Sequence, residues 1–307
     1  MIQFGAKKRL GKKTMKNSEG VAIAVIQLNS SFDVSRSLKA LDLQLQKITP
    51  GEVAAIFLPE NFAALAAPSP LAIGQREAGG EGPIRDYLKQ QSRSLEAYIF
   101  AGTLPLAVRP GGQPVPEGRV RAASFVLDPG GREVARYDKK HLFDVFVEDG
   151  QGQYLESATF EPGQALCVSE TTFGAVGLSV CYDLRFPELY RSLTAMGAEI
   201  ISVPSAFTQV TGKAHFEVLL RARAIENGCF VVAACQAGAH DSGRETFGHS
   251  MVVSPWGSII AVLPEGEGVL KASLDFEELH RFRAQIPSWH SPSVADHLKA
   301  SGTETAF

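Results

Sequence analysis

Short, almost uncharged runs rich in β-branched residues alternate with amphipathic segments from residue 21 onward. The runs at 21–28, 53–60 and 98–106 have the length and composition of strands that are buried on both faces. Between them, residues 34–48 and 84–97 place apolar side chains at near-helical spacing. This alternation predicts an α/β fold in which helices cover buried sheets.

The second half of the chain repeats the pattern and adds two hairpins. Tight turns are predicted at 128–131 (DPGG) and 254–257 (SPWG), because Gly and Pro favour such turns. The other predicted elements are strands at 174–183, 198–205 and 229–235 and helices at 187–197, 212–228 and 276–285.

No linker or short repeat interrupts these elements, so we expect one α/β domain with mixed sheets over residues 21–298. The segment 1–20 holds six basic residues and one acid and is interpreted as a disordered tail, with Met15 as an alternative start. Residues 299–307 are expected to form a C-terminal tail.

The composition excludes several classes of protein. A chain of 307 residues that is 45% hydrophobic is not disordered in bulk, and its net charge of −3 argues against binding nucleic acid through bulk charge. No run reaches the roughly 18 apolar residues of a membrane helix. The four cysteines include no Cys-x-x-Cys pair and no signal peptide is evident, so we expect free thiols and a cytoplasmic location.

Three reactive side chains follow apolar strands, where sites collect in α/β folds. Backbone N–H groups at a strand-to-helix turn would lower the thiol pKa of Cys181 and bind an oxyanion. Glu60 would act as a general base, and Lys140 would donate to an oxyanion. Taken singly, each has a plain structural alternative: a core cysteine, a surface acid and a solvated charge on a hairpin.

The sequence gives little support for a Cys-His dyad, a metal site or a nucleotide-binding motif. His215 and His249 are the histidines that a Cys-His dyad with Cys181 would use, but neither lies in a protease signature. No histidine pair has metal-ligand spacing, and the Gly-rich stretches match neither a P-loop nor a dinucleotide fingerprint. We therefore expect no metal and no organic cofactor.

Five motifs in order along the chain resemble the nitrilase, or carbon–nitrogen hydrolase, superfamily. That family uses a Glu-Lys-Cys triad, which the resemblance assigns to Glu60, Lys140 and Cys181. The motifs extend over nearly the whole chain and are FLPEN (57–61), YDKKHLFDV (137–145), GLSVCYDLRFPELYR (177–191), PSAFTQVTGKAHFEVLLRARAIENGCFVVAACQAG (204–238) and GHSMVVSPWG (248–257).

The resemblance also assigns roles outside the triad. It implies an oxyanion donor in the backbone N–H of Tyr182, a second glutamate near the triad in Glu156, and substrate-binding residues in Arg185, Thr211 and Phe207. An arginine suits a carboxylate, which it binds bidentately. A structural ion pair with Glu188 or Asp183 is the alternative for Arg185, and a helix cap is the alternative for Thr211.

The family fold implied is a four-layer α-β-β-α sandwich that pairs into a homodimer, with the helix after Cys181 and the C-terminal tail as interface elements. Within the superfamily the motifs are most similar to the Nit branch. This implies a hydrolase of non-peptide C–N bonds in linear amides, in which a cysteine thioester is formed. The expected substrate is a 2-oxo acid amide, deaminated glutathione foremost, cleaved to the acid and ammonia in metabolite repair.

Three alternatives stay open at this point. One is an ω-amidase for 2-oxoglutaramate or 2-oxosuccinamate, and another is a different C–N hydrolase, such as an N-carbamoyl amidohydrolase. The third is a non-catalytic binding protein on the same fold. An activated Cys181 that reacts with thiol reagents faster than the other cysteines would separate the enzymes from the binding protein.

Overall fold

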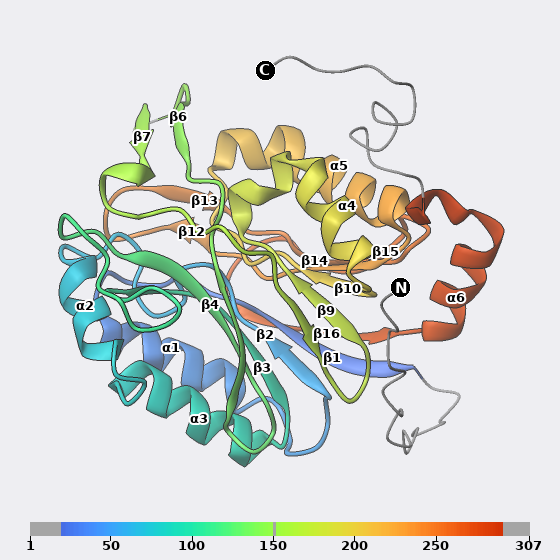
Figure 1. The fold of residues 1–307 in the computed structure, drawn as a ribbon, viewed down its shortest axis with the longest axis horizontal. Coiled ribbons are helices and arrows are strands. Elements are labelled where there is room, and N and C mark those ends of the chain that lie inside the picture. Colours follow the sequence, from blue (N-terminus) through green and yellow to red (C-terminus); the bar gives the residue numbers. More distant parts are fainter. Residues whose placement is uncertain (1–19, 150–151, 291–307) are drawn as a thin grey trace, which may run out of the picture.

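Two six-stranded mixed sheets lie face to face between two layers of helices in this computed structural model, which describes residues 20–149 and 152–290 (Figure 1). The tails predicted at 1–20 and 299–307 fall outside these residues, apart from Gly20. The α-β-β-α sandwich implied by the family resemblance is therefore confirmed.

The first sheet has β1, β2 and β3 as parallel neighbours and antiparallel pairs elsewhere. Its strands, in spatial order, are β16 (Gly268–Leu274), β1 (Val21–Gln27), β2 (Ala55–Phe57), β3 (Tyr98–Leu106), β4 (Arg121–Leu127) and β5 (Glu133–Asp138).

The second sheet is built in the same way, with β9, β10 and β11 parallel. Its order is β15 (Ile259–Leu263), β14 (Ser250–Val253), β11 (Phe230–Ala233), β10 (Ile200–Ser202), β9 (Ala175–Leu178) and β8 (Val168–Glu170). Two short hairpins stand apart, namely β6 (Asp144–Phe146) with β7 (Gln153–Leu155) and β12 (Ala237–Ala239) with β13 (Glu245–Phe247).

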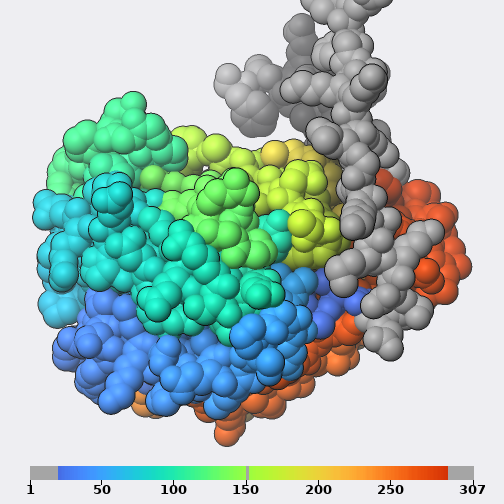
Figure 2. Space-filling view, turned by 90° about the horizontal axis from the view of Figure 1, so that it is seen from below, coloured from blue at the N-terminus to red at the C-terminus, as the bar shows by residue number. Residues whose placement is uncertain are grey.

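Helices cover the outer face of each sheet (Figure 1). The first sheet carries α1 (Val34–Leu45) and α3 (Pro83–Leu95), with α2 (Pro70–Glu77) against β3, and the second carries α4 (Pro187–Ala195) and α5 (Gln209–Asn227). Helix α6 (Phe276–Gln285) follows β16 and, in red, lies at one end of the molecule (Figure 2). The described residues also contain three short 3₁₀ turns: η1 (Glu156–Ala158), η2 (Cys181–Arg185) and η3 (Pro287–His290).

Strand β1 shows why the predicted strands are apolar throughout. Ile23 and Val25 point into the core between the two sheets, whereas Ala24 and Ile26 point into the core beneath α1 and α3. All four side chains are fully buried. Because side chains alternate across a strand, a sheet covered on both faces needs apolar residues at every position.

The predicted helices and long strands are present, with ends that differ by a few residues. The helix predicted at 212–228 begins earlier, at Gln209, because the side chain of Thr208 caps it by accepting from the backbone N–H of Thr211 (3.4 Å). Thr211 is therefore not the cap. Helix α2 and the three-residue strands β6, β7, β8, β12 and β13 were not predicted, since such short elements carry no clear periodicity.

Glycine at position 102 lets two segments near the strand ends approach closely. A Cβ atom on Gly102 would lie 1.7 Å from the carbonyl oxygen of Pro59 and 2.7 Å from that of Leu58. The chain that leaves β2 therefore crosses β3 without a side chain between them, and the backbone N–H of Asn61 donates to the Thr103 hydroxyl (2.9 Å). This close approach fixes where Glu60 points.

None of the helices within residues 20–149 and 152–290 is both long and apolar enough to cross a membrane.

Candidate active site

Four chemically active side chains meet at a cavity of about 420 Å³. They come from four separate segments: Glu60 follows β2, Lys139 follows β5, Glu156 opens η1 and Cys181 opens η2. The rest of the wall is mainly apolar and includes Leu65, Phe143, Tyr154, Phe160, Tyr182 and Phe207. A polar cluster in a mostly apolar cavity of this size is typical of a small-molecule site.

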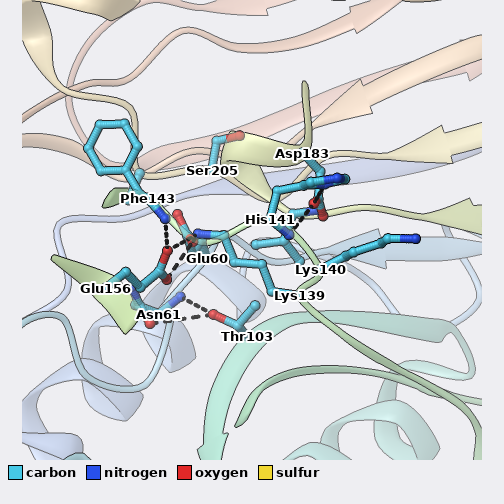
Figure 3. A network of polar contacts seen from close by, with 12 residues as sticks. Glu60, Asn61, Thr103, Lys139, Lys140, His141, Phe143, Glu156, Asp183 and Ser205 are labelled. Atoms are coloured by element: carbon cyan, nitrogen blue, oxygen red, sulfur yellow. Dashed lines mark hydrogen bonds and ion pairs between the residues drawn. The ribbon is translucent and has the colours of Figure 1, made fainter. Parts of the chain in front are cut away.

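A buried lysine holds the polar cluster together (Figure 3). The Nζ of Lys139 lies 2.8 Å from Oε1 of Glu60 and 2.9 Å from Oε2 of Glu156, and the lysine side chain is 2% exposed. Glu156 also accepts from the backbone N–H of Phe143 (2.6 Å). The lysine thus bridges two carboxylates that would otherwise repel each other.

The prediction that Lys140 is the lysine of the site is wrong by one residue. Lys140 is half-buried, extends away from both carboxylates and does not line the cavity, whereas its neighbour Lys139 does (Figure 3). Successive side chains of an extended segment point in opposite directions, so a shift of one residue moves a side chain to the other face. The two adjacent lysines are chemically identical in the sequence, and only their burial distinguishes them.

The charges of this cluster oppose the effect of burial. Burial by itself lowers the pKa of Lys139, but the carboxylates of Glu156 and Glu60 outweigh it and raise that pKa well above its ordinary value. Burial raises the pKa of Glu156, and the charge of Lys139 works against this rise. Lys139 therefore keeps its proton at neutral pH and stays a fixed positive charge beside the thiol.

Cys181 occupies a strained backbone position at the start of η2. Its φ is +47°, which is uncommon for a residue with a side chain, and its N–H donates to the carbonyl of Pro204 (2.9 Å). Residues held in this way at a strand end are frequent at active sites. The thiol faces the cavity next to Glu60 and the backbone N–H of Ala206.

The sequence led us to expect a lowered thiol pKa, and the structure indicates the opposite. Burial raises the pKa of Cys181 well above its usual value, and the charge of Glu60 adds to the rise. Lys139 and the N–H of Ala206 counteract only part of it. The thiol is thus protonated at neutral pH, so a base must remove its proton before it can act as a nucleophile.

Four residues were predicted to bind the oxyanion or the substrate, and three of them reach the cavity. Tyr182, Phe207 and Thr211 line it, whereas Arg185 lies just behind the wall. The guanidinium of Arg185 sits 5.5 Å from the centroid of the Phe207 ring and 3.3 Å, through Nη1, from Nδ1 of His215.

The structural ion pair considered for Arg185 is not formed within the described residues. Asp183 instead accepts from the Tyr137 hydroxyl (2.7 Å) and from the backbone of His141 (3.0 Å). Arg185 is therefore free of carboxylate partners in the described chain. Neither His215 nor His249, the histidines of the dyad alternative, lines the cavity.

Arg244 was missed from the sequence, although it also lines the cavity. It precedes β13 in a turn of small and polar residues, DSGRET, where nothing local marks it as a site residue. Only the fold brings this turn next to Ala206.

The chain is similar to known proteins over most of its length. The family model described as carbon-nitrogen hydrolase matches residues 22–284. A Yersinia enterocolitica protein named deaminated glutathione amidase is 40% identical over 89% of this chain and 92% of its own, and a human protein of that name is 38% identical over 86% and 80%. The Caenorhabditis elegans NitFhit structure superposes with a TM-score of 0.79 at 32% identity, covering 91% of this chain and 66% of that one.

The cause of the raised thiol pKa can be tested directly. Replacing Glu60→Gln removes a neighbouring negative charge and leaves Lys139 in place, so we expect the pKa of Cys181 to fall. At a fixed pH below that pKa, a larger fraction of the thiol would be ionised, and alkylation by iodoacetamide would be faster. The rate against pH, with peptide mapping to identify Cys181, measures this.

The exposed Glu188→Gln is the matched control and should leave the alkylation profile unchanged. A profile for Glu60→Gln that does not move, or moves to higher pH, would show that the Glu60 charge does not act on the thiol.

Proposed function

This chain belongs to the carbon–nitrogen hydrolase family and is an amidohydrolase, and we propose that its substrate is the 2-oxo acid amide deaminated glutathione. The observation that carries the proposal is the meeting of Cys181, Glu60 and Lys139 at the cavity. The names of the relatives and the volume of the cavity, about 420 Å³, support a substrate of tripeptide size.

In the proposed reaction, Glu60 takes the proton of the Cys181 thiol as the sulfur attacks the amide carbon. The negative charge that develops on the amide oxygen is held by Lys139, in the role first expected of Lys140, and by the backbone N–H of Tyr182. Lys139 suits this role because its carboxylate neighbours keep it protonated.

The C–N bond breaks as Glu60 returns the proton to the leaving nitrogen, and a thioester remains on Cys181. Water then attacks the thioester, with Glu60, assisted by Glu156, as the base. The acid is released and the thiol regains its proton. This scheme uses only side chains and backbone groups of the chain.

The nitrogen that leaves depends on the substrate. The amide nitrogen of deaminated glutathione carries the cysteinylglycine part, so the products are 2-oxoglutarate and that dipeptide. Ammonia, expected from the sequence as the second product, leaves only when the substrate is a primary amide such as 2-oxoglutaramate. An assay of the acid product therefore measures both kinds of substrate.

Arg185, Thr211 and Phe207 are proposed to bind the 2-oxo acid end. Phe207 and Thr211 line the cavity, and Arg185, free of carboxylate partners in the described chain, lies against the Phe207 ring. A guanidinium can bind a substrate carboxylate bidentately, which suits Arg185 to the 2-oxo acid end.

We further propose that the chain forms a homodimer through the helical layer of α4 and α5. Val218 on α5 is 67% exposed, and Ile225, seven residues further on, and Trp256 are also exposed large apolar side chains. Residues seven apart lie on the same helix face, and exposed apolar faces of this kind mark protein interfaces. The C-terminal tail, also expected at this interface, lies outside the described residues.

A cytoplasmic location is proposed from the four free thiols.

The substrate is tested by the release of the acid product from deaminated glutathione and from 2-oxoglutaramate, with Cys181→Ala as the blank. We expect a kcat/KM at least tenfold (about 1.4 kcal/mol) higher for deaminated glutathione. A preference for 2-oxoglutaramate would make the protein an ω-amidase. Turnover by Cys181→Ala would overturn the thioester mechanism.

The two adjacent lysines allow a matched test of which one stabilises the oxyanion. Lys139→Met removes the charge that faces the reacting carbonyl, so we expect kcat to fall by about 10²–10³-fold or more. Lys140→Met should stay within about twofold of the wild type. Steady-state kinetics on both variants, with circular dichroism to verify folding, measure this, and the reverse order would refute the assignment of Lys139.

The proposed dimer is tested by sedimentation velocity. A charge at a buried apolar contact is costly, so Val218→Asp should shift the protein from dimer to monomer. Leu43→Asp is the control, because Leu43 is 54% exposed but lies on α1 in the opposite helical layer. A wild-type chain that sediments as a monomer would rule the proposal out.

A further inference from the structure

Arg244 is a charged residue of the cavity wall that the proposed chemistry leaves without a role. Of the described residues that line the cavity, two carry a positive charge, Lys139 and Arg244. Lys139 is engaged by both carboxylates of the cluster. Arg244 is therefore the cation of the described wall that remains available for an anionic group of a ligand.

The guanidinium of Arg244 is only partly satisfied. One terminal nitrogen donates to the carbonyl of Ala206, and the group lies 5.5 Å from the centroid of the Tyr154 ring. Its Nε is buried and has no hydrogen-bond partner among the described residues, and no carboxylate there pairs with it. A buried donor without a partner costs free energy, which a bound acceptor would relieve.

The unused Nε is the atom that a carboxylate would take. A carboxylate binds the planar guanidinium with two parallel hydrogen bonds, commonly to Nε and one terminal nitrogen. The hydrogen bond to Ala206 and the Tyr154 ring hold the plane in position, so little side-chain entropy would be lost on binding.

Arg244 and Arg185 come from different elements and contact different residues of the cavity wall. Arg185 comes from η2 and lies against the ring of Phe207, whereas Arg244 comes from the turn before β13 and bonds to Ala206. Arg244 also lies 5.5 Å from the centroid of the Tyr154 ring, whereas Arg185 does not itself line the cavity. The two guanidinium groups therefore occupy separate positions, Arg244 in the cavity wall and Arg185 behind it.

On the basis of the proposed function, we infer that Arg244 binds the second carboxylate of the substrate, at the glycine end of the leaving dipeptide. Deaminated glutathione carries a carboxylate at each end, and 2-oxoglutaramate carries one. Arg185 and Thr211 take the 2-oxo acid end, and Arg244 takes the far end. Arg244 is thereby a specificity residue, which favours a long substrate with two negative charges over a short one with a single charge.

The test compares three substrates: deaminated glutathione, the same molecule with its glycine carboxylate converted to the amide, and 2-oxoglutaramate. Wild-type enzyme should cleave the free acid with a kcat/KM about 10- to 100-fold above that of the glycine amide. This ratio corresponds to the free energy of a hydrogen bond to a charged group. In Arg244→Met this ratio should fall to about one. Arg185→Met should lower kcat/KM for all three substrates.

Arg281→Met, at an exposed position on α6, is the control and should keep the wild-type ratio. Arg244→Lys keeps the charge but not the planar pair of donors, so an intermediate ratio is expected. The comparison of acid with amide in the wild type needs no variant, so it holds even if Arg244→Met folds poorly.

Two results would overturn the inference, and they are distinguishable. Equal wild-type rates on the acid and the glycine amide, or equal losses on both in Arg244→Met, would mean that Arg244 only holds Ala206 in place. A wild-type enzyme active on 2-oxoglutaramate but inactive on deaminated glutathione would remove the proposed substrate, and with it the second carboxylate.

Discussion

The buried ion pairs of Lys139 are the interaction on which the site depends. A lysine that is 2% exposed loses its hydration, and such a charge is tolerated only when opposite charges contact it. Glu60 and Glu156 supply these contacts from segments 79 and 17 residues away in the sequence. The buried lysine charge is therefore stable only if β2 and β5 end, and η1 begins, at the same place.

The fold meets this requirement through close backbone approach. Gly102 permits the chain after β2 to cross β3, and this directs the Glu60 carboxylate to the lysine. On the other sheet, β9 ends at Leu178, and Cys181 follows in a left-handed conformation that turns its thiol to the same cavity. The two sheets thus contribute different partners to one site: Glu60 and Lys139 follow strands of the first sheet, and the nucleophile follows a strand of the second.

This division has a chemical consequence. The thiol lies in a buried setting that keeps it protonated, next to a carboxylate that can accept the proton and a lysine that stays charged. Nucleophile, base and oxyanion donor are therefore in place before a substrate binds, so little reorganisation is needed during the reaction. The apolar walls exclude water and strengthen these electrostatic interactions.

The sequence alone determined the class of the fold and most of the site. Apolar runs such as 21–28 predict strands covered on both faces and hence an α/β fold, and the family resemblance implied the four-layer sandwich. Glu60 and Cys181 were recognisable because each stands at the end of such a run, within a motif of the family.

The tertiary structure decided what depends on direction and on distant neighbours. The choice between Lys139 and Lys140 rests on which side chain faces the interior, and two identical residues carry no such information. The rise in the pKa of the Cys181 thiol depends on its burial and on the charge of Glu60. Arg244 reaches the cavity because β13 pairs with β12 beside Ala206. These properties come from packing and from contacts between remote segments, which the local chemistry of a sequence does not specify.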